Sequence, residues 1–338
     1  MLAIFVVTFP FFALVAAGYA ATRLGLVPLE AIPGLNAFVL LFALPCMLYK
    51  FASMTPILRL LDPSIVLTYL IAAGVMVALA VAAARRGNTT WNDAAFGALV
   101  GSFPNSGFMG VPLLVALLGA AAAGPAIVAL AVDMVFTSSL CIALSQLGAA
   151  GEHGARRAAL QGLKGMLTNP LPWSILLGCL STASGQQLPA PLFNAVDMLA
   201  GAASPAALFT IGAVLARMRI VAGHRAASLA DLGASPAGSL LAAPVERRRG
   251  DTLQLVGCKV IAHPAIVLGL GSVAMALGAP LERSSLVVLV LTAALPSASN
   301  VPMLAERFGA DAGRIASVVL STTVVAFLTF PLAVALMK

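Results

Sequence analysis

Charged residues are scarce in this sequence. Of its 338 residues only 9% are Asp, Glu, Lys or Arg, whereas soluble domains carry about 25%. This shortage excludes an ordinary soluble domain. The hydrophobic share is 61%, and several apolar runs are long enough to cross a bilayer. The sequence therefore predicts an all-α polytopic membrane protein.

Cysteine is also rare, and its placement excludes the sites that cysteine usually builds. Cys46, Cys141, Cys179 and Cys258 all lie inside apolar segments at unrelated spacings. This pattern fits neither a zinc site nor a disulfide framework, and it is typical of cysteines that pack in a hydrophobic interior. We therefore expect no metal site and no cofactor.

Motifs of ATPases and intramembrane enzymes are missing as well. The sequence has no Gly-x-x-x-x-Gly-Lys-Ser/Thr motif, so ATP is not expected to be the direct energy source. Asp133 and Asp197 lack the Gly-x-Gly-Asp context of an aspartyl protease, and no Gly-x-Ser-x-Gly element accompanies His263. These absences disfavour an enzyme, and no catalytic residue is predicted.

Hydrophobic segments of roughly 20 residues predict ten membrane spans. The spans cover 2–21, 32–49, 64–84, 92–119, 124–147, 168–184, 190–216, 253–277, 284–308 and 315–337. Fourteen Lys and Arg residues fall in the loops on one side and four on the other. Because basic loops stay in the cytoplasm, we expect a plasma membrane protein (a bacterial inner membrane) with both termini on the extracytoplasmic side. The same rule accounts for the basic loops, so no nucleic-acid partner is predicted.

Short matches between the two halves predict an inverted repeat. Pro45 and Pro205 are 160 positions apart, as are Gly18 and Gly178, and VPLL at 111–114 matches VPML at 301–304 with an offset of 190. Five spans per half would make the halves inverted in topology. We expect five-helix repeats at 1–147 and 168–338, a cytoplasmic basic linker at 148–167, and a long cytoplasmic loop at 217–252.

Spans four and nine each contain a stretch that is ill suited to a membrane helix. GSFPNSGFMGVPLL (101–114) and ALPSASNVPML (294–304) both carry two prolines with small polar residues between them. A proline inside a helix costs about 3 kcal/mol, and irregular backbone at this depth survives only inside protein or beside water. The simplest interpretation is two half-helices per span, broken at 104–110 and 296–300. The predicted substrate-binding residues are Pro104, Asn105, Ser106, Gly107, Gly110, Pro112, Pro296, Ser297, Ser299, Asn300 and Pro302.

The downstream half-helices are expected to restart alike. Gly110 and Asn300 suit the N-cap position, and Pro112 and Pro302 fall in the first turn, where proline is tolerated. Two helix N-termini would then meet near the midplane, and such ends bind anions. Two alternatives stay open: carbonyls freed from the upstream halves hold a cation, or both spans are kinked structural helices.

These motifs resemble those of the auxin efflux carrier family. The resemblance is carried by PNSGFMGVPLL, by KVIAHPAIV (259–267) and by TAALPSASNVPMLAERFG (292–309), and it extends from FALPCMLY to STTVVAFLTFPL. The family includes plant PIN auxin exporters and bacterial malonate and malate carriers. It implies ten helices in two inverted repeats, with helices four and nine crossing where they unwind. It also implies an organic-anion site there, at Pro104, Asn105, Pro296 and Asn300. The segment 220–251 departs from the family pattern.

Three ionisable residues inside spans are candidates for ion coupling, because such groups are costly in a membrane. Asp133 lies near the middle of span five, while Lys259 and His263 lie four residues apart on one face of span eight. The coupling ion, a proton or sodium, stays open. The structural alternative is a buried Asp133–Lys259 ion pair that holds helices together.

The leading hypothesis is a secondary active transporter that moves a small organic anion by alternating access. The candidates are mono- or dicarboxylates such as malonate or malate, or an auxin-like acid. An anion channel or a membrane sensor on the same scaffold is the alternative. The expected partners are the anion and the lipid bilayer, with a homodimer left open.

Overall fold

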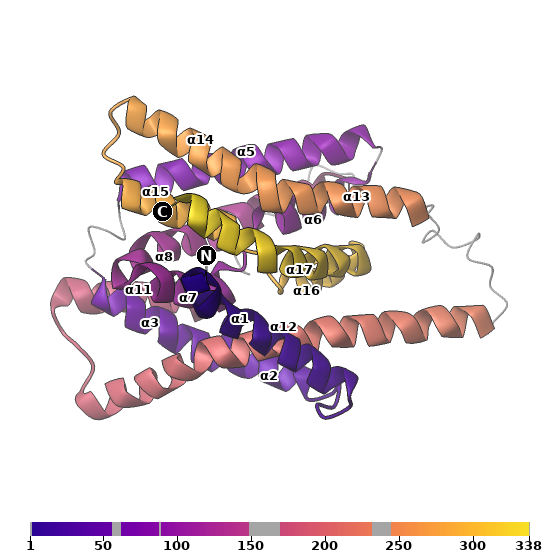
Figure 1. The fold of residues 1–338 in the computed structure, drawn as a ribbon, viewed down its shortest axis with the longest axis horizontal. Coiled ribbons are helices and arrows are strands. Elements are labelled where there is room, and N and C mark those ends of the chain that lie inside the picture. Colours follow the sequence, from indigo (N-terminus) through magenta and orange to yellow (C-terminus); the bar gives the residue numbers. More distant parts are fainter. Residues whose placement is uncertain (1, 56–61, 88, 149–169, 232–244, 338) are drawn as a thin grey trace.

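The computed structural model describes residues 2–55, 62–87, 89–148, 170–231 and 245–337 (Figure 1). These residues form helices, and the one strand-like feature among them is an isolated bridge between Pro104 and Ser297. The all-helical class predicted from the sequence is confirmed for this part of the chain.

Seven helical segments of the described chain are long and apolar enough to cross a membrane. They are Val6–Arg23, Ile32–Met54, Pro63–Arg86, Ala120–Ser145, Ala190–Val221, Gly250–Ala276 and Ala312–Met337. Three predicted spans contain no continuous helix of that length in the described residues. Spans 92–119 and 284–308 are divided into shorter helices, and span 168–184 contains the 15-residue helix α11 (Pro170–Ser184).

One set of helices packs together along the lower part of Figure 1, and we call it the first helix group. It consists of α1 (Leu2–Arg23), α2 (Ile32–Phe38), η1 (Val39–Ala43), α3 (Leu44–Met54), α11 and α12 (Ala190–Asp231). Within it α1 packs against α12, and α3 packs against both α11 and α12. The group therefore combines helices from the beginning of the chain with helices from its middle.

The remaining helices form the second helix group. They are α5 (Pro63–Arg86), α6 (Trp91–Ser102), η2 (Ser106–Gly110), α7 (Val111–Leu118), η3 (Ala120–Ala122), α8 (Ala123–Val132), η4 (Asp133–Thr137), α9 (Ser138–Ser145), η5 (Gln146–Gly148), α13 (Val245–Gly257), η7 (Cys258–Ala262), α14 (His263–Ala276), α15 (Arg283–Ala293), α16 (Val301–Arg307) and α17 (Ala312–Met337). Here α5 packs against α6 and α14, α14 against α15, and α13 against α17. Contacts of α12 with η2 and α17 join the two groups.

Glycines allow helices of the first helix group to approach closely. A Cβ added to Gly18 of α1 would lie 1.9 Å from the Phe209 carbonyl oxygen of α12. A Cβ added to Gly178 of α11 would lie 2.8 Å from the Tyr49 carbonyl oxygen of α3. Both distances are shorter than van der Waals contact with backbone, so neither position accepts a larger residue without separation of the helices.

Three of the four π turns in the described part of the chain precede a proline. The turn η1 is followed by Pro45, η2 by Pro112 and η7 by Pro264. Proline removes one helical hydrogen bond and clashes with the carbonyl four residues earlier, which here lies inside each π turn. The wider turn relieves that clash. The fourth π turn, η4, begins at Asp133 and has no such proline, so its cause lies elsewhere.

The predicted loop at 217–252 is largely helical where the structure describes it. Helix α12 continues to Asp231, and α13 begins at Val245 rather than near 253. A segment that connects two membrane spans can itself be helical, so the cytoplasmic placement expected for 217–252 stays a prediction. Alanine and arginine favour helix even without apolar neighbours.

Candidate functional site

Regular helix stops at two places inside the second helix group. Helix α6 ends at Ser102, and the next helical residues are those of η2 and α7. Helix α15 ends at Ala293, and α16 starts at Val301. These ends lie beside the breaks predicted at 104–110 and 296–300. We call residues 103–105 and 294–300 the interrupted segments.

The interrupted segments pair with each other across the bridge between Pro104 and Ser297. The Asn105 amide donates to the Pro296 carbonyl oxygen at 2.8 Å, and the Ala298 amide donates to the Phe103 carbonyl oxygen at 3.0 Å. Buried backbone groups need such partners, above all in a membrane protein. The pairing therefore explains how irregular backbone is stable in the protein interior. We call this place the crossing.

A serine side chain caps the end of α6. In a continuous helix the Val100 carbonyl oxygen would accept from the amide of residue 104, but Pro104 has no N–H. Ser297 of the other interrupted segment donates its Oγ–H to this oxygen at 2.6 Å. Because Ser297 is only 1% exposed, water does not replace this bond. The contact links the two interrupted segments through a side chain as well as through the backbone.

A lysine side chain caps the end of α15. The Ala293 carbonyl oxygen would accept from the Ser297 amide in a continuous helix, but that amide donates to Thr322 Oγ1 at 3.2 Å. Lys259 Nζ donates to the Ala293 oxygen instead, at 2.8 Å. Thr322 was not singled out from the sequence, since a threonine in an apolar span carries no distinctive signal.

The regular α-helices α7 and α16 start directly after Gly110 and Asn300. Gly110 is the N-cap of α7 and Asn300 is the N-cap of α16, with Pro112 and Pro302 in the first turns. Before α7, however, the chain is already helical through η2, so the helical path starts about one turn earlier. The amides of Gly107 and Phe108 then lie in its first turn, where the helix offers no acceptor.

Gly110 also packs against the second interrupted segment. A Cβ added to Gly110 would lie 2.6 Å from Leu295 Cδ1, whereas one added to Gly107 would keep an ordinary 3.5 Å from Leu130 Cδ1. The absence of a side chain at Gly110 therefore lets η2 and the interrupted segment touch. Its φ is an ordinary −65°, so space rather than backbone conformation demands the glycine.

The crossing contains neutral polar side chains. Asn105 is 4% exposed and Asn300 is half-buried, and the carboxamide oxygen of each has no hydrogen-bond partner among the described residues. Ser106 donates weakly to the Pro104 carbonyl oxygen at 3.4 Å, and Ser299 is buried. Carboxamides offer both donors and acceptors, so they can bind a carboxylate without placing a formal charge in the protein interior.

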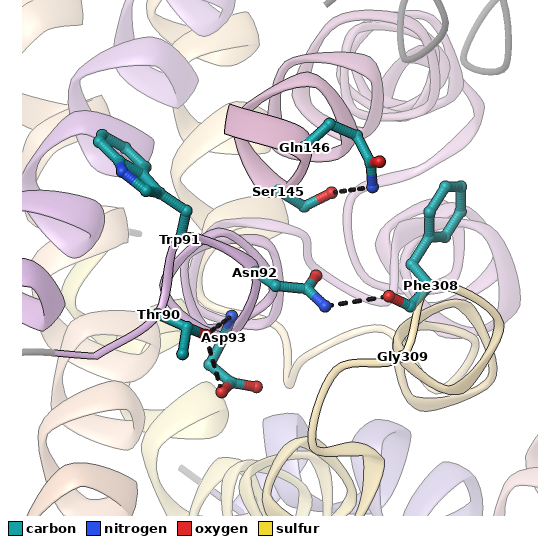
Figure 2. A pocket seen from close by; sticks show the side chains of 8 residues that line it. All are labelled: Thr90, Trp91, Asn92, Asp93, Ser145, Gln146, Phe308 and Gly309. Carbon is teal, nitrogen blue, oxygen red and sulfur yellow. Dashed lines mark hydrogen bonds between the residues drawn. The ribbon is translucent and has the colours of Figure 1, made fainter. Parts of the chain in front are cut away.

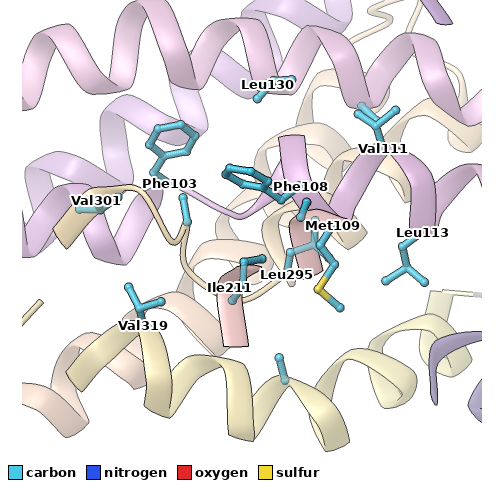
Figure 3. Close-up of a cluster of buried hydrophobic side chains, with 14 of the residues drawn as sticks. Phe103, Phe108, Met109, Val111, Leu113, Leu130, Ile211, Leu295, Val301 and Val319 are labelled. Carbon is cyan, nitrogen blue, oxygen red and sulfur yellow. The ribbon is translucent and has the colours of Figure 1, made fainter. Parts of the chain in front are cut away.

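Apolar side chains surround the crossing (Figure 3). Phe103, Phe108, Met109 and Leu295 come from the interrupted segments and η2, and Ile211 comes from α12 of the first helix group. All five are buried. The crossing therefore lies where the two helix groups meet, in an environment that strengthens each polar contact made there.

A buried carboxylate lies in the second helix group, at the start of η4. Asp133 is 0% exposed. Tyr69 of α5 donates its hydroxyl to Asp133 Oδ2 at 2.8 Å, and Thr137 donates to Oδ1 at 2.9 Å. Tyr69 was missed from the sequence. The available signal was a tyrosine in an apolar span, whose hydroxyl needs a partner when buried.

Lys259 and His263 lie together beside this carboxylate. Both are 0% exposed, and Lys259 Nζ is 3.1 Å from His263 Nδ1. Within the described residues His263 Nε2 has no hydrogen-bond partner. The rings of Tyr69 and His263 are 6.1 Å apart. The predicted candidates for coupling are therefore gathered in one place, together with Tyr69.

The alternative prediction of a direct Asp133–Lys259 ion pair is not what the structure contains. The two residues interact electrostatically, but Asp133 accepts from hydroxyl groups and Lys259 donates to the Ala293 carbonyl oxygen. The pairing fails because the interruption after α15 leaves a carbonyl that takes the ammonium group. Asp197, by contrast, pairs with Lys50 at a part-exposed position.

A pocket lies at the other end of α6 (Figure 2). It is lined by Thr90, Trp91, Asn92, Asp93, Ser145, Gln146, Phe308 and Gly309. Helix α6 has 12 residues, so at about 1.5 Å per residue this pocket is roughly 18 Å from the crossing. It is therefore separate from the predicted substrate site.

Arg314 joins several helix ends near this pocket. It forms an ion pair with Asp251 of α13, and its Nη1 donates to the Asp93 carbonyl oxygen at 3.0 Å. Asn92 Nδ2 donates to the Phe308 carbonyl oxygen at 2.9 Å. These contacts tie the start of α6 to α13, to α17 and to the end of α16.

Comparison with known proteins adds independent findings. A family model described as "Membrane transport protein" matches residues 3–334. A protein of Rhizobium meliloti (strain 1021) named "Putative malonate transporter" is 29% identical over 324 residues, which cover 95% of this chain and 91% of that protein. Both findings point to a transporter rather than to an enzyme.

Proposed function

This chain belongs to the membrane transport protein family, the auxin efflux carrier family that its motifs resemble, and on that premise we propose that it is a secondary carrier of a small organic anion. The observation that supports this best is the crossing, where two interrupted segments meet and the carboxamides of Asn105 and Asn300 lie in an apolar interior. The N–H groups of a carboxamide can donate to a carboxylate, whereas the two oxygens, which have no partner among the described residues, accept only and would pair with a donor such as a water that enters with the ligand.

The proposed architecture is ten spans in two inverted five-span repeats, with spans four and nine broken at the crossing. The glycine contacts of the first helix group support it. Gly18 and Gly178 are 160 positions apart, and so are Tyr49 and Phe209. Gly18 of the first half contacts Phe209 of the second half, and Gly178 of the second half contacts Tyr49 of the first. The threonine four residues after each glycine donates its hydroxyl to that glycine's carbonyl oxygen, at 3.0 and 3.2 Å. Equivalent contacts with exchanged halves are typical of repeats related by a two-fold axis.

In the proposed mechanism, the two helix groups move relative to each other while the crossing stays intact. The crossing is held within the second helix group by the caps from Ser297 and Lys259. Its other side faces α12, where Ile211 lies beside the interrupted segments (Figure 3). Rocking of one helix group against the other would expose the site alternately to each side of the membrane, as expected for repeat-based carriers.

The proposed substrate is a mono- or dicarboxylate, for which malonate is the first probe because the relative's name refers to it. One carboxylate would accept hydrogen bonds from the Asn105 and Asn300 amides and from the amides of Gly107 and Phe108, at a helix N-terminus that favours negative charge. A channel or sensor remains the second candidate function. A plasma membrane location with both termini extracytoplasmic and a homodimeric state are further expectations.

Counterflow of radiolabelled malonate in proteoliposomes tests the proposal. A carrier preloaded with unlabelled malonate accumulates label transiently, whereas a channel does not. Asn105→Ala and Asn300→Ala should each lower the specificity for malonate by about tenfold or more, since a hydrogen bond to a charged group contributes about 1.5–3 kcal/mol. Asn194→Ala is the matched control, because Asn194 is exposed on α12. Normal counterflow by Asn105→Ala would disprove the site.

A further inference from the structure

We infer that Asp133 is the binding site for a proton that moves together with the anion, and that Lys259 connects this site to the crossing. The inference rests on the proposed carrier function and adds its coupling ion. It is carried by the geometry of four buried side chains, Tyr69, Asp133, Lys259 and His263, none of which belongs to the proposed substrate contacts.

The partners of Asp133 suit a group that gains and loses a proton. Both carboxylate oxygens accept from hydroxyl groups, those of Tyr69 and Thr137. A hydroxyl is a donor and an acceptor, and it can rotate. When Asp133 binds a proton, one hydroxyl can turn and accept from the new O–H, so that the protonated carboxyl keeps a partner. An arginine or a backbone amide in the same place would hold only the ionised carboxylate.

The contact between Lys259 and His263 limits the charge of this cluster. An ammonium and an imidazolium have only donors towards each other, so the 3.1 Å contact between Nζ and Nδ1 requires that one of the two groups be neutral. With one cation here and an ionised Asp133, the cluster is neutral. One added proton on Asp133 makes it positive by one unit, while the contact between Lys259 and His263 stays as it is.

The cluster is built from Tyr69 of α5, Asp133 of η4, Lys259 of η7 and His263 of α14. Among the described residues, the thiol of Cys141 in α9 is a further titratable group that interacts with it, through Asp133. Helix α15 contributes the Ala293 carbonyl oxygen.

The positive charge that protonation adds to the cluster lies near the crossing, the proposed site of the anion. Lys259 Nζ donates to the carbonyl oxygen of Ala293, the last residue of α15 before the interrupted segment. A neutral cluster leaves the anion at the crossing uncompensated in an apolar interior, which is costly. A cluster with one extra proton offsets one negative charge electrostatically, and Lys259 places its ammonium group next to the interrupted segment. Proton and anion therefore favour each other's binding, which is the requirement for symport.

The unpaired nitrogen of His263 supports exchange of this proton. His263 Nε2 is buried without a hydrogen-bond partner among the described residues, and its ring lies 6.1 Å from that of Tyr69. A purely structural histidine in an apolar interior would have both nitrogens paired. The π turn η4, which begins at Asp133 and is not explained by a proline, is a further sign of a functional position.

Proton movement in proteoliposomes, with the membrane potential clamped, tests the inference. In wild-type vesicles, entry of malonate should acidify the lumen, and an inward proton gradient should drive accumulation of malonate. Asp133→Asn should keep malonate exchange but lose the proton-driven accumulation, by roughly tenfold. Asp197→Asn, which alters a part-exposed carboxylate paired with Lys50, is the control and should behave as wild type. Equal lumen acidification by wild type and Asp133→Asn would overturn the inference.

A second measurement separates this inference from the proposed function. Infrared difference spectra of the purified protein between acid and alkaline pH should contain the C=O band of a protonated carboxylic acid. Asp133→Asn should remove the component of that band that belongs to Asp133, and Tyr69→Phe, which keeps the ring and removes the hydroxyl, should shift it. No substrate is needed, so a band that is unchanged in Asp133→Asn overturns the proton site even if malonate proves to be the wrong anion. Absence of malonate counterflow with the band present would instead reject malonate transport alone.

Discussion

The serine cap at the end of α6 gives a quantitative test of how the crossing is held. Ser297 Oγ donates to the Val100 carbonyl oxygen at 2.6 Å, and Pro104 is the reason that this oxygen has no helical partner. Ser297→Ala removes the donor and leaves a buried carbonyl unsatisfied. Pro104→Ala supplies a backbone amide at the position from which a continuous helix would donate to the same oxygen. The two substitutions therefore act on one acceptor.

The expected cost follows from the burial of this oxygen. Ser297 is 1% exposed, so the carbonyl cannot turn to water when the hydroxyl is lost. Loss of a partner from a buried group costs about 1–3 kcal/mol, and we expect Ser297→Ala to lower the free energy of unfolding by about 2 kcal/mol. In the Pro104→Ala background the backbone at Phe103, which is extended here (φ −93°, ψ 104°), is free to turn helical, and the new amide then replaces the hydroxyl. The cost of Ser297→Ala should then fall by roughly half or more, as for residues that share a partner.

Equilibrium unfolding in mixed micelles measures this double-mutant cycle. Ser317→Ala is the control, since Ser317 on α17 is exposed and donates to the Gly313 carbonyl oxygen in its own helix. Its effect should stay within about 0.5 kcal/mol. A Ser297→Ala protein as stable as this control would refute the reasoning, and so would strictly additive effects of Ser297→Ala and Pro104→Ala.

Two further substitutions test contacts around the crossing and the pocket. Gly110→Ala should destabilise the protein by about 1–3 kcal/mol, because the new Cβ would lie 2.6 Å from Leu295 Cδ1. Leu295→Ala should relieve part of this cost, and Gly201→Ala, with open space around it, should cost nothing; equal stability of the two glycine variants in thermal unfolding would contradict the packing argument. Arg314→Gln should destabilise by about 1–3 kcal/mol, because it breaks the ion pair with Asp251 and removes the donor to the Asp93 carbonyl oxygen, both at part-buried positions. Arg219→Gln, at an exposed position of α12, is its control in the same thermal assay, and an equal melting temperature for both would refute that role.

Some features of the site were accessible from the sequence because they depend on local chemistry. Proline has no amide hydrogen, so the prolines at 104 and 296 predicted helix ends close to those found at Ser102 and Ala293. The N-cap positions of Gly110 and Asn300 followed from the proline two residues after each. The all-helical class and the transport family likewise followed from composition and motifs.

The hydrogen-bond partners of the buried ionisable residues could not be predicted from the sequence in the same way. The sequence offered Asp133 and Lys259 as an ion pair, since opposite charges are the simplest buried partners. The structure instead gives Asp133 the hydroxyl of Tyr69 and gives Lys259 the carbonyl of Ala293. That carbonyl is available only because the Ser297 amide is drawn away to Thr322. The partner of each group is therefore set by contacts that are distant in the sequence. Lys259 and Ala293 are separated by 34 positions, and Ser297 and Thr322 by 25.

The sequence by itself determined that this chain is a helical membrane protein of a transport family, and it indicated that regular helix ends near the prolines at 104 and 296. Hydrophobicity and proline act on the residues around them, so they can be read along the chain. Only the tertiary structure decided that the interrupted segments pair with each other, and that Ser297 and Lys259 cap the ends of α6 and α15. Backbone carbonyl and amide groups that a local break leaves without a helical partner pair with whichever group the fold brings near. Helix packing decides which group that is.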